Sequence, residues 1–355
     1  MLKKIIKLSS QLIRLRTNSG NNVQLNKALD LITAELDNYY LERFVKNGSQ
    51  SILINNKSKK IRNYKVILNG HLDIIPGKDF QYRPLEKKGR LYGVGSMDMK
   101  ANVAALLFTF KNIADKVNYP LGLQIVTDEQ LGGFKTTKYQ IDQGVRAKFV
   151  IAGETTNFKI VNKAKGVLWL KITYKGKTAH SAYPWRGKNS ILAINSFLSK
   201  LIRKYRQPST KEWLTTINPS NIETTNKTYN KIPDDCALYL DVRYTPEDKL
   251  ILKEIQEMLP HKSKIEVVVN EPPMIVEDQN PYLQKLKKSS EKITGKKVSF
   301  SAAQGSSDAR HYVQIGGSAV EFGPIGQGGG TDNEWVDIKS LELYNKILED
   351  FLLGI

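Results

Sequence analysis

The sequence contains a single cysteine, Cys236, among its 355 residues. One cysteine cannot form a disulfide within the chain, and this composition fits a reducing compartment. The sequence also lacks any run of roughly eighteen apolar residues, the length that a membrane-spanning helix needs. Polar and charged residues interrupt the N-terminal segment 1–15 as in an amphipathic helix, so it differs from a secretory signal. We therefore expect a cytoplasmic protein without a membrane span.

Acidic residues are scarce relative to basic ones, because 35 Asp and Glu against 54 Lys and Arg give a net charge of +19. Such a charge would favour nucleic-acid binding if the basic residues were clustered. They are instead spread through the expected helices and loops, and no nucleic-acid-binding module accompanies them. We therefore expect other partners, and an anionic substrate or an acidic carrier protein would suit the same positive field.

The chain is longer than one hydrophobic core usually supports, so two domains are expected. Up to about residue 165, apolar runs alternate with helical patterns, which predicts an α/β domain with a largely parallel sheet flanked by helices. Residues 166–275 read as strand, helix, strand, helix, strand, the order of a small antiparallel sheet with helices on one face. Residues 276–355 then return to helix, strand and helix. The middle segment is therefore predicted to be an inserted domain.

Three expected strands of the first domain end in side chains that can bind a metal or transfer a proton. The strand at 66–68 leads into His71 and Asp73, the strand at 121–126 leads into Asp128 and Glu129, and the strand at 149–152 leads into Glu154. Ligands bind outside the carboxyl ends of the strands in an open α/β sheet. The three endings are therefore expected to converge on one crevice.

Each of these residues also has a simpler interpretation as a solvated or structural loop residue. The chemical interpretation is that Asp73 orients the imidazole of His71, while Glu129 acts as a general base on a metal-activated water. The glycine-rich segment 93–100 matches neither the dinucleotide fingerprint nor the Walker sequence, and the alternative is a tight turn that presents Asp98 as a ligand. His180 lies in a polar turn, where it either binds a ligand or stabilises the turn.

Taken in order, these motifs resemble the zinc metallopeptidase and amidohydrolase family of succinyl-diaminopimelate desuccinylase, acetylornithine deacetylase, aminoacylase and related carboxypeptidases. The resemblance runs from the N-terminal helix to the C-terminal helix. Its motifs are Gly70-His-Leu-Asp73, Gly95-Ser-Met-Asp-Met-Lys100, Asp128-Glu129, Gly153-Glu-Thr155, Ala179-His-Ser-Ala182, Gly187-Lys-Asn189, Asn230-Lys-Ile-Pro-Asp234, Asp241-Val-Arg243, Ser307-Asp-Ala-Arg310, Phe322-Gly-Pro324 and Asn333-Glu334.

The resemblance implies a zinc-exopeptidase-like catalytic domain formed by residues 1–165 and 276–355. The segment 166–275 would be a ferredoxin-like lid through which the protein forms a homodimer. The implied reaction is cleavage of an amide bond in an N-acylated amino acid or small peptide. The implied cofactor is zinc, with cobalt and manganese as substitutes.

Carried over position by position, the resemblance implies roles for individual residues of the first domain. His71, Asp98 and Glu154 would be the ligands of one zinc ion, and Asp98 would bridge to a second ion where one is bound. Glu129 matches the general base, and Asp73 would orient His71.

The inserted domain would contribute three further residues. His180 would polarise the scissile carbonyl in the neighbouring subunit's site, and Asn230 and Arg243 would hold the substrate carboxylate.

Two departures from the family pattern affect the second metal. An acid and a histidine are usual where this chain has Gln130 and Gly330, and neither replacement is a good zinc ligand. Asp332 and Glu334 are the nearby acids that could replace them. A zinc site with three protein ligands and an open position is sufficient for hydrolysis, so we expect an enzyme with one metal ion. The competing hypothesis is a catalytically inactive binding or scaffolding protein on the same fold.

Overall fold

The computed structural model describes the whole chain, residues 1–355. The chain divides into two compact units. The first unit comprises Met1–Lys163, Ile275–Ser301 and Ser307–Ile355, and the second comprises Ala164–Met274 and Ala302–Ser306. No helix combines the length and the apolar character needed to cross a lipid bilayer.

The first unit is built around a nine-stranded sheet with the order β1-β2-β6-β3-β7-β15-β8-β13, and β14 pairs with β8. Strands β6, β3, β7 and β15 are parallel to one another, whereas β1 and β2 are antiparallel to their neighbours. The prediction of a mixed, largely parallel sheet is therefore confirmed. The strands are β1 (Tyr40–Lys46), β2 (Ser49–Asn55), β3 (Asn63–His71), β6 (Leu121–Val126), β7 (Arg146–Ala152), β8 (Ile160–Ala164), β13 (Met274–Ile275), β14 (Phe300–Ala303) and β15 (Ser318–Glu321).

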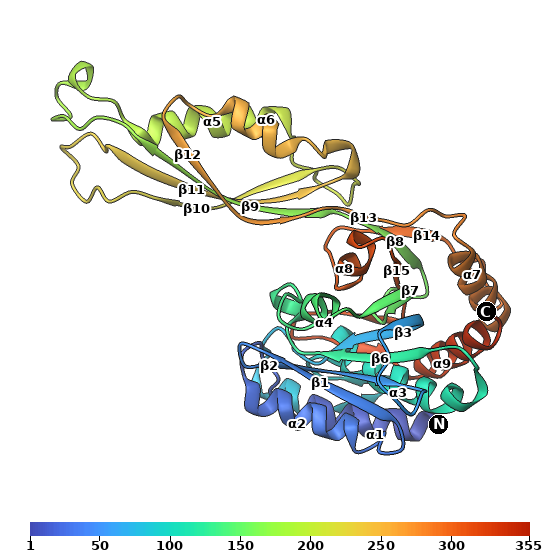
Figure 1. Ribbon diagram of the computed structural model, residues 1–355. Helices are drawn as coiled ribbons and strands as arrows, with labels where there is room; N and C mark the ends of the chain where they lie inside the picture. Colours follow the sequence, from blue (N-terminus) through green and yellow to red (C-terminus); the bar gives the residue numbers. More distant parts are fainter. The chain divides into compact units, whose positions relative to one another are not determined.

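Helices flank this sheet on both faces (Figure 1). The large hydrophobic core joins the sheet to α1, α2, α3, α7 and α9, while α4 and α8 lie on the other face. Helix α3 is apolar on nearly every side because it is buried between the sheet, α1 and α9. The helices are α1 (Leu2–Ile13), α2 (Asn22–Thr33), α3 (Ala101–Ile113), α4 (Thr137–Asp142), α7 (Pro281–Thr294), α8 (Ala309–Gln314) and α9 (Ile338–Leu353).

A second, four-stranded sheet in the first unit has the order β16-β17-β5-β4. Its strands are β4 (Leu85–Lys87), β5 (Arg90–Tyr92), β16 (Gly326–Gln327) and β17 (Trp335–Asp337). The small sheet thus pairs the hairpin at residues 85–92 with the segment 326–337, which contains Gly330.

The second unit is an antiparallel sheet with the order β10-β11-β9-β12. Helices α5 and α6 cover one face of it (Figure 1), and their apolar side chains form a separate core with the strands. The elements are β9 (Gly166–Lys175), α5 (Ser190–Lys204), β10 (Thr216–Glu223), β11 (Asp235–Tyr244), α6 (Ile251–Met258) and β12 (Ser263–Glu271). The chain order βαββαβ with this strand order is the ferredoxin-like arrangement.

Strand β10 is an element that the sequence pattern does not predict. It is an edge strand, most of its side chains are exposed, and its register shifts between Pro219 and Asn221. Proline is tolerated at such an edge because the missing N–H group costs no ladder hydrogen bond there. The expected order of three strands and two helices is therefore corrected to four strands and two helices.

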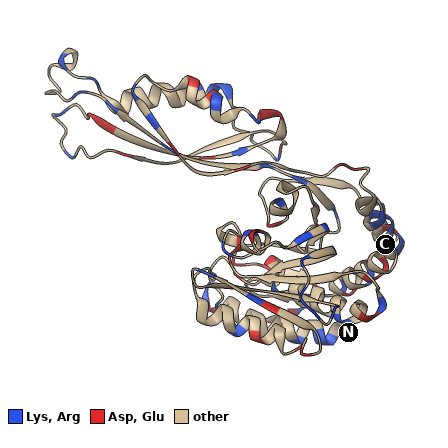
Figure 2. Ribbon diagram, viewed as in Figure 1, with Lys and Arg blue, Asp and Glu red and all other residues tan.

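The excess positive charge is distributed rather than concentrated. Figure 2 shows Lys and Arg on helices and loops of both units, with Asp and Glu between them.

Candidate metal centre

Four side chains come together at the carboxyl edge of the central parallel strands. His71 is the last residue of β3, and Glu129 and Glu154 follow the ends of the neighbouring strands β6 and β7. Asp98 comes from the turn at Ser96–Lys100, directly before α3. Parallel neighbouring strands end at the same sheet edge, so three segments far apart in sequence deliver their side chains to one place.

His71 lies at the centre of this group. Its Nε2 atom is 2.9 Å from Oδ1 of Asp98, 3.6 Å from Oε1 of Glu154 and 4.0 Å from Oε2 of Glu129. One potential ligand atom from each of His71, Asp98 and Glu154 lies within 4.8 Å of the other two. This spacing allows the three side chains to bind one common ion.

Asp73 orients both the imidazole and the loop that carries Glu129. The Nδ1 atom of His71 is 2.8 Å from the backbone carbonyl oxygen of Asp73 and 3.6 Å from its carboxylate. If Nδ1 carries the proton and donates to this carbonyl, Nε2 presents its lone pair to the three acids. The Asp73 carboxylate accepts hydrogen bonds from the backbone N–H groups of Glu129 and Gln130, at 3.2 and 2.9 Å.

The electrostatics of the cluster favour a bound cation. Burial, together with neighbouring negative charge, raises the pKa of Glu154 to about 8 and the pKa of Glu129 well above its usual range. Burial alone would lower the pKa of His71, but the hydrogen bond with Asp98 and the surrounding carboxylates raise it well above its usual value. The imidazole of His71 lies within 4.0 Å of a carboxylate oxygen of each of the three acids.

A divalent cation would relieve this concentration of buried negative charge, and imidazole nitrogen and carboxylate oxygen are donors that zinc binds. The residues present therefore fit a metal ion.

Of the two positions where the sequence departs from the family pattern, Gln130 contacts Asp98, and Gly330 follows a residue that lies close to Asp98. The side-chain amide of Gln130 donates to Oδ2 of Asp98 at 3.3 Å. Gly330 follows Gly329 in the same loop. A Cβ atom added at Gly329 would lie 3.7 Å from Cβ of Asp98. The amide N–H group of Gln130 thus occupies Oδ2 of Asp98, the carboxylate oxygen that does not face His71.

The two acids near Gly330 are engaged elsewhere. Glu334 is buried, and its Oε1 atom accepts hydrogen bonds from the backbone N–H groups of Met97 and Asp98 at 3.0 and 3.2 Å. Asp332 forms an ion pair with Lys78. Glu334 therefore holds the turn that presents Asp98, and neither acid replaces the missing ligands in this conformation.

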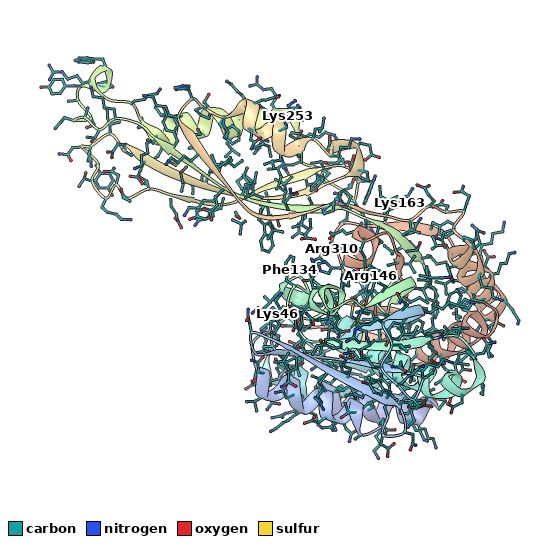
Figure 3. The ribbon with its side chains drawn as sticks, viewed as in Figure 1. Lys46, Phe134, Arg146, Lys163, Lys253 and Arg310 are labelled. Atoms are coloured by element: carbon teal, nitrogen blue, oxygen red, sulfur yellow. The ribbon has the colours of Figure 1, made fainter.

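The segment Ser307–His311 holds the loop that follows Glu129. The sequence pattern includes Ser307–Arg310 among the family motifs but predicts no role for this segment. The carbonyl oxygen of Gly132 accepts from Nη2 of Arg310 at 2.6 Å, and Nε2 of His311 lies 2.9 Å from it. Arg310 also lies over the ring of Phe134, with Cζ 5.8 Å from the ring centroid; Figure 3 labels both residues. Asp308 is buried and accepts from the hydroxyl of Thr137.

We predict that Gly133→Ala destabilises the protein strongly. A Cβ atom at Gly133 would lie 1.9 Å from Oδ1 of Asp308, and the residue has φ +67°. Strain in the left-handed region and overpacking together are expected to cost about 2–4 kcal/mol of unfolding free energy. Chemical denaturation measures the loss. The control is Gly89→Ala, with φ +73° and open space around it, which should lose only about 1 kcal/mol; equal losses in both variants would show that the contact with Asp308 contributes nothing.

The remaining predicted site residues, His180, Asn230 and Arg243, lie in the second unit. The exposed turn of His180 pairs with the segment of Asn230, whose carbonyl oxygen accepts from Ser181 at 2.9 Å. Nδ1 of His180 accepts from the backbone N–H of Ala182 at 3.1 Å, so its Nε2 atom carries the proton and can donate to a carbonyl oxygen.

Arg243 makes no hydrogen bond with either His180 or Asn230. It lies on β11, where Nε and Nη2 bond to the carboxylate of Asp241 at 2.8 and 3.1 Å. This pairing fixes the guanidinium plane and uses one of its edges.

Known proteins share the sequence pattern of this chain. The profile of the peptidase family M20/M25/M40 matches residues 67–354. A succinyl-diaminopimelate desuccinylase from Rickettsia bellii is 24% identical, covering 93% of this chain and 92% of that protein. The corresponding enzyme from Helicobacter pylori is 25% identical, covering 93% of this chain and 90% of that protein.

Solved structures share the fold at lower identity. An aminopeptidase, PepT, from Bacillus cereus has a TM-score of 0.81 at 18% identity, covering 99% of this chain and 98% of that one. A metallo-carboxypeptidase from Sulfolobus solfataricus has a TM-score of 0.78 at 17% identity, with the same coverage.

Proposed function

Because this chain belongs to the peptidase family M20/M25/M40, a family of metal-dependent amide hydrolases, we propose that it cleaves the amide bond of an N-acylated amino acid or small peptide. The observation that carries the proposal is the cluster of His71, Asp98 and Glu154 with Glu129 beside it. The named relatives include desuccinylases and peptidases, which supports this substrate class.

We assign the metal to His71, Asp98 and Glu154, and we expect one zinc ion; cobalt and manganese suit the same donor atoms. When bound, the cation supplies Lewis acidity that polarises a carbonyl and makes water more acidic. Glu129 accepts the proton of the attacking water and returns it to the leaving amine. Burial raises the pKa of this carboxyl, so it is more basic than an exposed glutamate, as a general base requires.

The second unit is assigned to substrate binding and dimer formation. His180 donates from Nε2 to the scissile carbonyl of the partner's substrate, and Asn230 and the free edge of Arg243 are assigned to the substrate carboxylate. Eight residue steps of β11 separate Asp235 from Arg243, so in this proposal the two groups reach the carboxylate from different subunits. The net charge of +19 favours anionic substrates, and an acidic carrier protein is the macromolecular partner that the same charge would attract. We place the enzyme in the cytoplasm.

The competing hypothesis of an inactive binding protein receives no support from the relatives that match. The intact acid cluster also argues against it, since burying several carboxylates costs stability unless a cation or a proton compensates. A panel of N-succinyl amino acids, N-acetyl amino acids and tripeptides, assayed with zinc, tests the proposal. Hydrolysis that depends on zinc is the expected result, and zinc binding without any hydrolysis would favour the binding protein.

We predict that the paired variant Gln130→Glu with Gly330→His raises the metal content from one zinc per chain to two. The glutamate would place a carboxylate where the Gln130 amide now contacts Asp98, and a Cβ atom at position 330 would meet nothing closer than Cδ1 of Ile75 at 3.5 Å. Histidine is among the residues that tolerate the φ of +70° found there.

Elemental analysis after dialysis measures the metal content. Gln130→Glu alone, which supplies only one of the two ligands, is the matched control and should stay near one. Two zinc ions per chain in the unmodified protein would contradict the assignment of a single-metal centre.

A further inference from the structure

A cavity of about 660 Å³ lies in the first unit at the amino ends of its central strands. Its lining includes the first residues of β3 and β7 and the residues directly before β6 and β15. The metal centre lies at the other end of these strands. Strand β3 alone separates the two places by eight residue steps, or about 26 Å at roughly 3.3 Å a step. The cavity is therefore distinct from the proposed active site.

The charged side chains of the cavity are all cationic. Lys65, Arg146 and Lys148 line it, and no Asp or Glu does. None of the three forms an ion pair. Three unpaired cations around one cavity leave a local field that favours an anion.

Two of these cations are held in place. Nη1 of Arg146, which Figure 3 labels, donates to the carbonyl oxygens of Ile141 and Val145 at 2.7 and 2.9 Å, and its Nε and Nη2 groups make no hydrogen bond within the chain. The ammonium group of Lys65 lies 4.7 Å from the ring centroid of Tyr119. Fixed cations lose less conformational entropy on binding a ligand than freely rotating ones do.

The rest of the lining is largely apolar. Tyr119, Pro120 and Ile315 supply a ring and aliphatic surface. Gly316 and Gly317 close one side without side chains, so a ligand can approach the backbone there. A volume of this size, with largely apolar walls and a few polar groups, is characteristic of small-molecule sites.

We propose that this cavity is a second binding site, for a small molecule that joins an anionic phosphate or carboxylate group to a flat apolar body. Lys65, Arg146 and Lys148 bind the anionic group, and the ring of Tyr119 contacts the flat part. The proposal is independent of the reaction at the metal centre.

Isothermal titration of the zinc-loaded protein with phenyl phosphate tests the site, with inorganic phosphate, phenol and benzoate as comparisons. We expect phenyl phosphate to bind with a Kd of about 1 mM or tighter, and both inorganic phosphate and phenol to bind more weakly. Benzoate distinguishes a carboxylate site from a phosphate site. The Lys65→Gln, Lys148→Gln double variant should weaken phenyl phosphate binding about tenfold or more, because two charge-assisted contacts are lost.

Two control variants separate this cavity from the overall charge of the protein and from the metal centre. Lys3→Gln with Lys4→Gln removes the same charge from the exposed face of α1 and should leave binding unchanged. His71→Ala removes a proposed metal ligand and should also leave it unchanged. Binding lost in His71→Ala but kept in the Lys65/Lys148 variant would place the anion on the metal. Equal weakening in both lysine pairs, or no binding to the unmodified protein at about 10 mM probe, would overturn the proposal as well.

Discussion

Glu129→Gln is expected to lower kcat by about 10²–10⁴-fold while the zinc content stays the same. The amide keeps the shape of the side chain but cannot accept a proton, and Glu129 is not one of the three residues assigned to the metal. Its Oε2 atom lies 4.0 Å from Nε2 of His71, close enough to the assigned metal ligands to reach a water beside them. Steady-state kinetics on a hydrolysed N-acyl amino acid, with metal analysis of the same preparation, measure both quantities.

Glu86→Gln is the matched control for this experiment. Glu86 is exposed on β4, and the same chemical change there should leave kcat unaltered. Full activity in Glu129→Gln would eliminate it as the general base. Loss of zinc together with activity would show instead that Glu129 is a ligand.

His71→Ala is expected to remove both the metal and the activity. The substitution leaves two carboxylates, Asp98 and Glu154, where three ligand atoms had been within 4.8 Å of one another. Two carboxylates without the imidazole are a poor zinc site, so zinc should fall from about one per chain to nearly none after dialysis. Elemental analysis and the hydrolysis assay follow the two losses.

His261→Ala, at an exposed position of the second unit, is the control and should retain zinc and activity. Because the His71 side chain is buried, its removal leaves a cavity, and added imidazole is expected to restore part of the zinc binding. The unfolding temperature of the zinc-free forms separates loss of metal from loss of fold. Retention of one zinc ion in a folded His71→Ala variant would refute the assigned ligand set.

The sequence by itself predicted the parts that depend on local patterns. Alternating apolar runs and helical periods identified the α/β unit. The positions of His71, Glu129 and Glu154 just at or after the ends of three strands predicted that these side chains would meet. These predictions succeed because parallel neighbouring strands end at one edge of the sheet, whatever the details of packing. The run of ordered motifs predicted the family, and the profile match to residues 67–354 confirmed it.

Strand β10 shows where local patterns fail. Pro219 and the exposed polar residues around it resemble a loop, and only pairing with β11 makes the segment a strand. Edge strands have one free side and little burial, so neither their hydrogen bonds nor their periodicity distinguishes them in sequence.

The tertiary structure decided the remaining features of the site, because each depends on distances between segments remote in sequence. In the folded chain Gln130 donates a hydrogen bond to Asp98, and Glu334 accepts one from the turn that carries Asp98. Asp308 packs against Gly133. Cations from β3 and β7 also lie around one cavity at the amino ends of the central strands. Strand register and side-chain packing determine such contacts, whereas residue spacing along the chain determined which side chains reached the carboxyl edge of the sheet.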